Sequence, residues 1–495
     1  MRAALRFNAD DLRARDLHAH LLSRLGGSEH ARELLRVTLA LDPLDWMARW
    51  LLDGSLPSDG QTRLDLAIDL MRWGDHAGAL NVLRADGVDL PMRLYYVASV
   101  FRRLGLEAEE SQAREQAAAA PRDYLFPARL EDLIVLEEAV ATNPRDARAH
   151  YALGNLFYDR RRYHEAIKHW QFAAKLDPSF ATVHRNLGIA CFNVLHAPNK
   201  AKAAYDRALR ADPNDARLLY ERDQLAKRLG DVPADRLRRL QKRRDLVEQR
   251  DDLSVEFAAL LNLVGRHKEA REFLLSRRFQ PWEGGEGQAL GQYVVTQLAL
   301  GRQALNADDA ATARACFEAA LTPPESLGEA RHLLANFSHV HYWIGVACTQ
   351  SDDKAAAKRH YVLAADFVGD FQNMSVRSFS EMTYFSALAQ RALGRKREAE
   401  RTLKELLAYA KQLEREPAKV DYFATSLPTM LLFEDDLQAR QVFAAKLMQA
   451  QAMLGLGNSA PASKLLKALS RLDPSDALVV ELLRDGSDAG RSRKR

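Results

Sequence analysis

Residues 147–178 read ARAHYALGNLFYDRRRYHEAIKHWQFAAKLDP, and this stretch decides the fold. Its apolar residues recur at helical spacing in two runs, which predicts two amphipathic helices joined by a turn. Gly154 and Ala166 are both small, so we expect the two helices to cross at these positions with their backbones close together. Pro178 ends the second helix, because proline cannot continue a helix. The stretch therefore predicts a helical hairpin.

The same marks return further along the chain. Leu187 and Gly188 follow Leu153 and Gly154 by one period of about 34 residues. An extra residue in the turn around Pro198 shifts the rest of this second copy by one position. The second copy continues with Ala201, Tyr205 and Ala208. Weaker copies place small, aromatic or leucine residues at Ala79, Leu83, Ala270, Leu274, Gly301, Ala313, Phe317, Ala320, Gly345, Ala357, Tyr361, Ala364, Ala387, Ala399 and Leu403.

This spacing resembles the tetratricopeptide repeat, a helix–turn–helix unit. The resemblance implies an all-α solenoid, a right-handed superhelix in which each hairpin buries one face on its neighbour and leaves a concave surface. The predicted ranges are irregular repeats over 1–120, well-formed repeats over 121–232, divergent repeats over 233–484 with a loop at 281–287, and a disordered basic tail over 485–495.

The composition agrees with a helical chain and disfavours nucleic-acid binding as a function. Hydrophobic residues make up 47% and charged residues 28% of the 495 residues, and glycine and proline are scarce, which disfavours a β-sandwich or barrel. The net charge of +4 is too balanced to predict nucleic-acid binding. The basic stretch 236–250 is interpreted as one long helix with Leu237, Leu240, Leu246 and Val247 inward and its arginines in water.

The expected location is the cytoplasm. Three cysteines without CxxC spacing favour a reducing compartment. No apolar stretch approaches the roughly 18 residues of a membrane span. The first residues carry charges where a signal peptide needs an apolar run. We therefore expect neither a membrane nor a nucleic acid among the partners.

The concave surface is the predicted binding surface, because the first helix of each hairpin lines it. A carboxylate clamp of the kind some tetratricopeptide domains carry is matched in part by Asn155, Asn186 and Arg217, but Tyr151 and Glu221 stand where a basic residue is needed. A general groove for a peptide or a partner domain is therefore preferred. The positions expected to be exposed there are Arg148, Tyr151, Asn155, Tyr158, Arg185, Asn193, Arg217 and Tyr220.

The loop in residues 278–293, RFQPWEGGEGQALGQY, is not explained by the repeat. Trp282, Glu283 and Glu286 are candidates for a contact surface that stacks on a sugar or binds a partner. The alternative is a bend loop, with the tryptophan tucked into the core and the glutamates in water. A phosphate-binding loop is excluded, because no strand precedes it and no Lys-Ser or Lys-Thr follows it.

Four strings suggest a second resemblance: PWEGGEG, DYLFPARLEDLIVLEEAV at 123–140, RNLGIACFN at 185–193 and DYFATSLPTMLLFEDDLQAR at 421–440. They are similar to the C-terminal helical-repeat half of large bacterial proteins whose N-terminal half is a β-sandwich domain of unknown function. This chain lacks that half. The resemblance implies a β-sandwich domain as a possible partner.

Catalytic and metal sites are not predicted. His339 and His341 are two residues apart, so on a helix they point away from each other and do not converge on a metal. His150, His184 and His341 each take the place of a bulky core residue and are expected to be packed and hydrogen-bonded. No catalytic serine or cysteine motif is present. We therefore expect no enzyme activity, no cofactor and no metal.

The sequence thus predicts a non-catalytic scaffold that holds a peptide or a partner domain in the groove of a helical-repeat solenoid. The alternative function is an accessory helical half of a carbohydrate-active enzyme whose β-sandwich catalytic domain is encoded separately or is missing.

Overall fold

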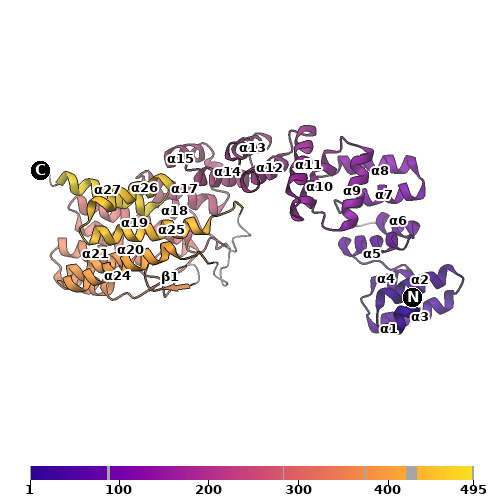
Figure 1. Ribbon diagram of the computed structural model, residues 1–495, viewed down its shortest axis with the longest axis horizontal. Helices are drawn as coiled ribbons and strands as arrows, with labels where there is room; N and C mark the ends of the chain where they lie inside the picture. Colours follow the sequence, from indigo (N-terminus) through magenta and orange to yellow (C-terminus); the bar gives the residue numbers. More distant parts are fainter. Residues whose placement is uncertain (1, 86–89, 283, 373–374, 420–431, 493–495) are drawn as a thin grey trace. The chain divides into compact units, whose positions relative to one another are not determined.

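The computed structural model describes residues 2–85, 90–282, 284–372, 375–419 and 432–492. Over these residues the chain has 27 α-helices, one short 3-10 helix and a single two-stranded hairpin (Figure 1). The predicted all-α fold of paired helices is confirmed. The chain divides into two compact units, Met1–Ala190 (unit 1) and Cys191–Arg495 (unit 2). This boundary falls inside the range 121–232, which the sequence predicts to hold the best-formed repeats.

Unit 1 consists of helices that pack in sequential pairs, namely α2 with α3, α5 with α6, α7 with α8 and α10 with α11. Its helices are α1 (Arg2–Phe7), α2 (Leu12–Arg24), α3 (Ser28–Leu41), α4 (Trp46–Asp53), α5 (Gly60–Arg72), α6 (His76–Arg84), α7 (Arg93–Leu104), α8 (Glu107–Ala119), α9 (Leu130–Thr142), α10 (Ala147–Asp159) and α11 (Tyr163–Leu176), and α12 (Ala181–Asn193) crosses the boundary.

Unit 2 continues the pairing, with α19 on α20, α21 on α22, α24 on α25 and α25 on α26. Its elements are α13 (Pro198–Ala211), α14 (Ala216–Arg228), α15 (Pro233–Gln241), α16 (Arg244–Val247), α17 (Asp251–Leu263), α18 (His267–Leu275), α19 (Gln288–Asn306), α20 (Ala310–Leu321), η1 (Glu325–Leu327), α21 (Ser338–Gln350), α22 (Lys354–Ala365), β1 (Asp370–Gln372), β2 (Ser375–Arg377), α23 (Thr383–Ala392), α24 (Lys396–Arg415), α25 (Leu437–Gly455), α26 (Ser459–Leu472) and α27 (Ala477–Ser492).

Aspartates start many of these helices. A side-chain oxygen at the N-cap accepts a hydrogen bond from one of the first backbone N–H groups, which have no partner inside the helix. Asp146 does this for α10, where its carboxylate accepts from the Ala149 N–H at 2.8 Å. Other aspartate caps of this kind in the described residues are Asp11, Asp45, Asp59, Asp75, Asp215, Asp309, Asp353, Asp436 and Asp476.

The small-residue spacing corresponds to close helix crossings. At Gly154 a Cβ atom would lie 2.3 Å from the Trp170 ring, so only glycine lets α11 approach α10 this closely. The predicted apolar faces are buried, with Ala166 fully covered between the two helices. Gly301 against Phe317 and Gly345 against Tyr361 repeat the arrangement in unit 2. The hairpin packing predicted from residues 147–178 is therefore confirmed.

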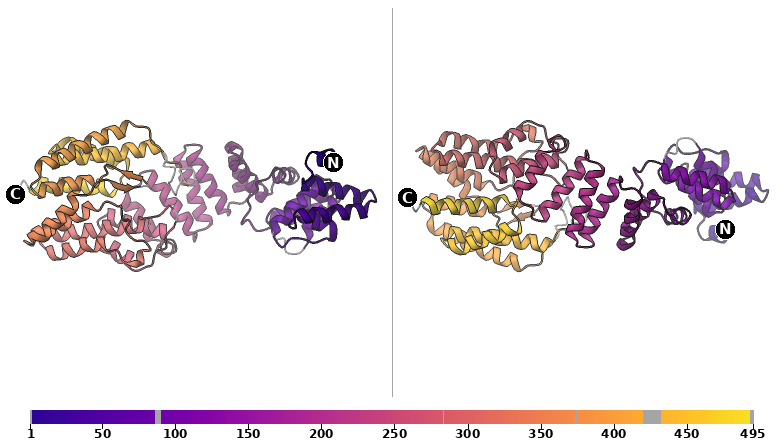
Figure 2. Two further views of the ribbon diagram at one scale, coloured as in Figure 1. Left: turned by 90° about the horizontal axis from the view of Figure 1, so that it is seen from below. Right: turned by 90° about the horizontal axis from the view of Figure 1, so that it is seen from above.

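The end of unit 2 packs back on its middle. The last helix, α27, contacts α17, and Figure 2 shows the yellow end of the chain beside the pink middle of unit 2. The guanidinium of Arg302 on α19 forms ion pairs with Glu481 and Asp485. Asp485 is therefore held in α27, which continues to Ser492. The sequence predicts a disordered tail over 485–495, whereas the structure has residues 485–492 in α27, and residues 493–495 lie outside the described residues.

The basic stretch 236–250 also differs from the prediction of one long helix. It contains the end of α15 and the separate helix α16, because the backbone leaves the helical conformation at Arg243. The four apolar residues named for it are buried as predicted. Arg236, however, is fully buried and not in water, since its guanidinium pairs with two carboxylates, Asp223 and Glu256, each at 2.5 Å.

Candidate functional site

Four of the predicted binding residues lie on one face of α10. Arg148, Tyr151, Asn155 and Tyr158 are spaced three or four residues apart, which aligns their side chains along a helix. We call this surface the α10 face. The structure shows that its members have different roles, because part of this chain lies across it.

Arg148 belongs to the interior of unit 1. Its side chain is 3% exposed, and its three guanidinium nitrogens donate to the carbonyl oxygens of Pro91 at 2.8 Å, Ala117 at 2.9 Å and Pro121 at 3.0 Å. Ala117 is in the last turn of α8, where carbonyls have no partner within the helix. The prediction that Arg148 is exposed for a partner is wrong, because this chain uses its donors.

Tyr151 is also buried, which corrects the prediction that it is exposed. Its ring packs against Phe180, with centroids 4.6 Å apart. Burial raises the pKa of its hydroxyl, and the nearby Asp123 acts in the same direction, against the effects of Asn155 and Arg185. Tyr151 therefore belongs to the packing beneath the α10 face and not to its accessible surface.

Asn155 is the most specific polar group on the face. Its amide oxygen accepts hydrogen bonds from the Trp170 indole N–H at 3.1 Å and from the Asn186 amide at 3.2 Å. These bonds fix the orientation of the side chain, so its amide nitrogen donates outward, to the carbonyl oxygen of Leu125 at 3.1 Å. Asn155 thus donates to a backbone carbonyl of the chain. Because every residue of a peptide has a backbone carbonyl, a contact of this kind can recognise a peptide whatever its sequence.

The neighbouring predicted residues are half-buried. The Tyr158 ring lies against Tyr163 and Trp170, with centroids 4.9 and 5.1 Å away. On α12, Arg185 is half-buried, and its guanidinium lies 3.4 Å from the side-chain oxygen of Asn186. The structure therefore brings Asn155 and Asn186 together, with Arg185 beside them.

The other predicted groove residues lie in unit 2. Arg217 is exposed as predicted, and its guanidinium donates to the buried carboxylate of Glu221 at 2.8 Å. Tyr220 is half-buried. Asn193 is half-buried and already engaged, since its amide donates to the Leu432 carbonyl at 3.1 Å and accepts from the Glu434 N–H at 3.0 Å.

The α10 face is covered by a segment that sequence reasoning does not identify. Residues 121–128 connect α8 to α9 without regular secondary structure apart from a turn at 123–124. Three side chains along α10 and at its end hold carbonyl oxygens of this segment in the same order: Arg148 holds Pro121, Asn155 holds Leu125 and Arg160 holds Ala128. The only sequence signal is the pair of prolines at its ends, which by themselves indicate a break in the repeat.

The loop at 281–287 is stabilised within unit 2. Trp282 is half-buried and packs against the core formed by α15 to α19. A Cβ at Gly285 would lie 1.8 Å from its ring, so the glycine lets the tryptophan fold back over the loop. Glu286 is exposed, as the bend-loop alternative expects, and Glu283 lies outside the described residues. A contact role for Trp282 and Glu286 stays a prediction.

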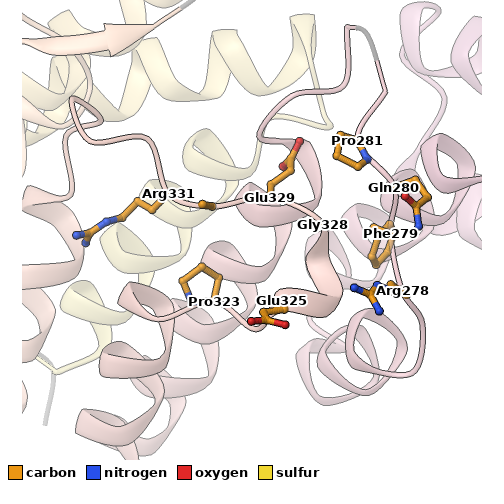
Figure 3. A pocket seen from close by; sticks show the side chains of 10 residues that line it. Arg278, Phe279, Gln280, Pro281, Pro323, Glu325, Gly328, Glu329 and Arg331 are labelled. Atoms are coloured by element: carbon orange, nitrogen blue, oxygen red, sulfur yellow. The ribbon is translucent and has the colours of Figure 1, made fainter.

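An open pocket of about 770 Å³ lies next to this loop (Figure 3). Residues 278–281 form one side and residues 323–331 the other. Glu329 anchors the loop, because its carboxylate accepts from the Gly287 N–H at 2.9 Å. Burial, with a contribution from Glu286, raises the pKa of Glu329 above its ordinary value. The pocket brings no catalytic arrangement of side chains together among the residues that the structure describes.

The three histidines predicted to take core positions, His150, His184 and His341, are packed and hydrogen-bonded, as predicted. The Nε2–H groups of His150 and His184 donate to the carbonyls of Pro144 and Pro178 at 3.2 and 3.0 Å. His150 also pairs with His169 through their Nδ1 atoms at 2.9 Å, and His341 pairs in the same way with His360 at 3.1 Å. In the described part of the chain, no three or more histidine, cysteine or acidic side chains converge as a metal site would require. No described helix combines the length and hydropathy of a membrane span.

Comparisons with known proteins give the same kind of fold. Residues 154–194 match a family model described as a TPR repeat, and residues 135–170 match one described as a tetratricopeptide repeat. A curated relative, the type IV pilus assembly protein PilF of Pseudomonas aeruginosa, is 32% identical over 143 residues. The match covers 28% of this chain and 55% of that protein, so the chain spans about half the length of this relative.

Solved structures that resemble parts of the chain are helical-repeat proteins. The P. aeruginosa PilF structure has 18% identity and a TM-score of 0.20, covering 52% of this chain and 89% of PilF. A thermophilic TPR protein from Thermus thermophilus has 21% identity and a TM-score of 0.23, covering 41% and 99%. A tetratricopeptide repeat protein from Parabacteroides merdae has 14% identity and a TM-score of 0.25, covering 58% and 98%.

Proposed function

We propose that this chain, in which residues 135–194 match tetratricopeptide repeat models, is a non-catalytic scaffold that binds an extended peptide of a partner protein. The binding surface is the exposed part of the α10 face together with Arg185 and Asn186 on α12. The observation that carries the proposal is the Asn155 amide, which two hydrogen bonds hold in place and which donates to a backbone carbonyl.

The chemistry of this surface fits a peptide. An extended peptide exposes backbone carbonyls that need donors, and Asn155 supplies one at a fixed orientation. Arg185 adds a positive charge beside Asn186, which favours carbonyl or acidic groups on the partner. Tyr158 contributes an aromatic surface that is partly accessible. Arg148 is excluded from the predicted set, because it is buried and its guanidinium also holds the Pro91 and Ala117 carbonyls, which lie outside residues 121–128.

The similarity to a pilus assembly protein supports a more specific form of the proposal. In this form the partner acts in the assembly of a type IV pilus, as the name of the P. aeruginosa relative states for that protein. A cytoplasmic location stays part of the sequence-based prediction. The alternative function, an accessory half that closes a β-sandwich partner, is supported by the partly exposed Trp282 beside the open pocket.

Affinity capture with surface variants tests the proposal. The tagged full chain is used to capture proteins from an extract of its own organism, and these are identified by mass spectrometry. Asn186→Ala and Arg185→Glu should each lower capture of the true partner at least tenfold. Arg238→Glu is the control, because its side chain is 68% exposed and lies on α15 in unit 2, outside the proposed surface.

Equal capture of that partner by the wild type and by both α12 variants would contradict the proposed surface. Capture that depends on Trp282 and not on Asn186 would instead favour the β-sandwich alternative. Circular dichroism melting of each variant shows whether the fold is retained.

A further inference from the structure

The segment 121–128 lies along the α10 face as an extended peptide would. Its carbonyls of Pro121, Leu125 and Ala128 are held in order by Arg148, Asn155 and Arg160. From position 148 to position 160 a helix rises about 18 Å. Seven residues of fully extended chain span about 23 Å, so a nearly extended segment with one turn matches the length of the helix.

The side chains of this segment alternate as they do in a peptide bound on one side. Leu125 is fully buried and Pro127 is buried, whereas Tyr124 and Phe126 are 82% and 74% exposed. A connection that served only to join two helices would gain nothing from two exposed aromatic side chains. The segment therefore anchors itself through Leu125 and Pro127 and presents its aromatic residues outward.

Contacts at the two ends of the segment keep it in place. None of these contacts is a hydrogen bond from its aromatic side chains. Arg122 forms an ion pair with Asp177 and lies over the Phe180 ring at 4.6 Å. At the other end, Asp132 accepts from the backbone N–H groups of Ala128 and Arg129 at 2.8 and 2.9 Å. Between these anchors the backbone of Tyr124 has a φ of 55°, which is unfavourable for an aromatic residue. The centre of the segment is thus strained while its ends are fixed.

We propose that residues 121–128 are a built-in occupant of the α10 face, and that the partner peptide takes their place. The replacing peptide is extended and carries a large aliphatic side chain where Leu125 is buried and a proline two residues later. The backbone carbonyl of its aliphatic residue accepts from Asn155, as that of Leu125 does. This inference rests on the proposed function and specifies its ligand and its regulation. Because the occupant is tethered, it competes at a high effective concentration and lowers the apparent affinity of a free peptide.

A synthetic peptide with the sequence of residues 120–129, APRDYLFPAR, blocked at both ends and labelled with a fluorophore, is the probe. Fluorescence anisotropy measures its binding to the full chain. Leu125→Asp places a charge where Leu125 is buried and should release the occupant, so this variant should bind the peptide at least tenfold more tightly than the wild type. Leu125→Ala, which is gentler to the fold, should give an intermediate affinity.

Matched controls define the site. Tyr124→Asp changes an exposed residue of the same segment and should leave peptide binding at the wild-type level. Adding Asn155→Ala to Leu125→Ala should weaken peptide binding about tenfold, and a peptide with aspartate at the leucine position should not bind. Equal affinity of the wild type and both Leu125 variants, or no binding to any of them while Leu125→Ala stays folded, would overturn the proposal.

The two proposals fail in different ways. In one outcome, partner capture depends on Asn186 but releasing the occupant leaves peptide binding unchanged. The proposal of a built-in occupant is then wrong, and the proposed function stands. If the Leu125 variants bind the peptide tightly but partner capture is indifferent to Asn186 and Arg185, the occupant is real and the proposed function is wrong.

Discussion

Single residues show how the repeat pattern becomes a fold. The glycine of a hairpin is required because an aromatic ring from the second helix occupies the space of its missing Cβ, as Trp170 does at Gly154. The same contact recurs at Gly301 and Gly345. Since both partners lie within one hairpin, the sequence spacing is sufficient to predict the contact.

We expect Gly154→Ala to destabilise unit 1 by about 1–3 kcal/mol, because the new methyl group would overlap the Trp170 ring and force the helices apart. Gly291→Ala is the control. Gly291 is also in a helix, but nothing lies within 4 Å of the position that a methyl group would take there, so alanine should be neutral or stabilising by up to about 1 kcal/mol. Urea unfolding measures both, and an unchanged free energy for Gly154→Ala would contradict the crossing.

The buried histidine pairs predict sensitivity to acid. Burial, together with His360 and Arg331, lowers the pKa of His341 to about 4 from its ordinary 6.5. The unfolded chain then binds more protons than the folded one between these values, so the stability present above pH 6.5 is lost as the pH falls towards 4.

The variant His341→Gln removes this titration. Between about pH 7.5 and about pH 5 its melting temperature should fall less than that of the wild type, as measured by circular dichroism in the same buffers. A fall of equal size in both proteins would show that the folded and unfolded states do not differ in the protonation of His341 over this range. His30→Gln, at an exposed position, is the control and should follow the wild type.

At the scale of elements, buried ion pairs join helices that follow one another closely in the sequence. Arg236 on α15 connects α14 through Asp223 and α17 through Glu256, and it also donates to the Ser475 hydroxyl at 3.1 Å. Burial acts to raise the pKa of Glu256, but Lys227 and Arg236 outweigh it and bring that pKa to about 2. The carboxylate is therefore charged and depends on its cations.

Arg236→Met should lower the stability of unit 2 by about 3–5 kcal/mol, because it leaves two buried carboxylates without their shared cation. Arg238→Met, on the same helix but exposed, should change stability by about 0.5 kcal/mol or less. Denaturant unfolding followed by circular dichroism measures both changes. Similar small effects for the two variants would show that the buried network is not held as described.

The loop at 281–287 gives a second prediction at this scale. Trp282→Ala should cost about 1–2 kcal/mol, less than for a fully buried tryptophan, because the ring is only partly covered by the core of unit 2. Gln280→Ala, at an exposed position, should have no measurable effect. A loss of stability below about 0.5 kcal/mol for Trp282→Ala would contradict its packing against the core.

The limits of sequence-based prediction are visible at the same scale. Hairpins are predictable because Gly154, Ala166 and Trp170 are close in the sequence and define their own contact. The burial of Arg148 is not, since it depends on the Pro91 carbonyl, which belongs to another part of unit 1. Asn155 is identified as a binding residue from its position alone, but its occupant at residues 121–128 can be seen only in the structure.

The whole molecule is a chain of helical hairpins in two units, and its candidate binding surface lies on α10 and α12 within unit 1. Different residues stabilise the helical hairpins and form the candidate binding surface. The glycine–aromatic crossings and buried ion pairs keep the hairpins together, whereas Asn155, Arg185 and Asn186 place polar groups at the surface. Changes at Arg185 should alter partner binding with little change in stability. Asn155→Ala would also remove the acceptor of the Trp170 indole N–H.

Photo-crosslinking from position 182 tests the central claim most directly. A photo-reactive amino acid replaces Thr182, an exposed residue one turn before Arg185 on α12, and a second protein carries it in place of the exposed Arg238 as the control. After irradiation in the native cells, mass spectrometry identifies the crosslinked residues. The account predicts crosslinks from position 182 to one short segment of a single partner, weakened by Asn186→Ala and absent from position 238. Crosslinks to that partner from position 238 and none from position 182 would contradict it.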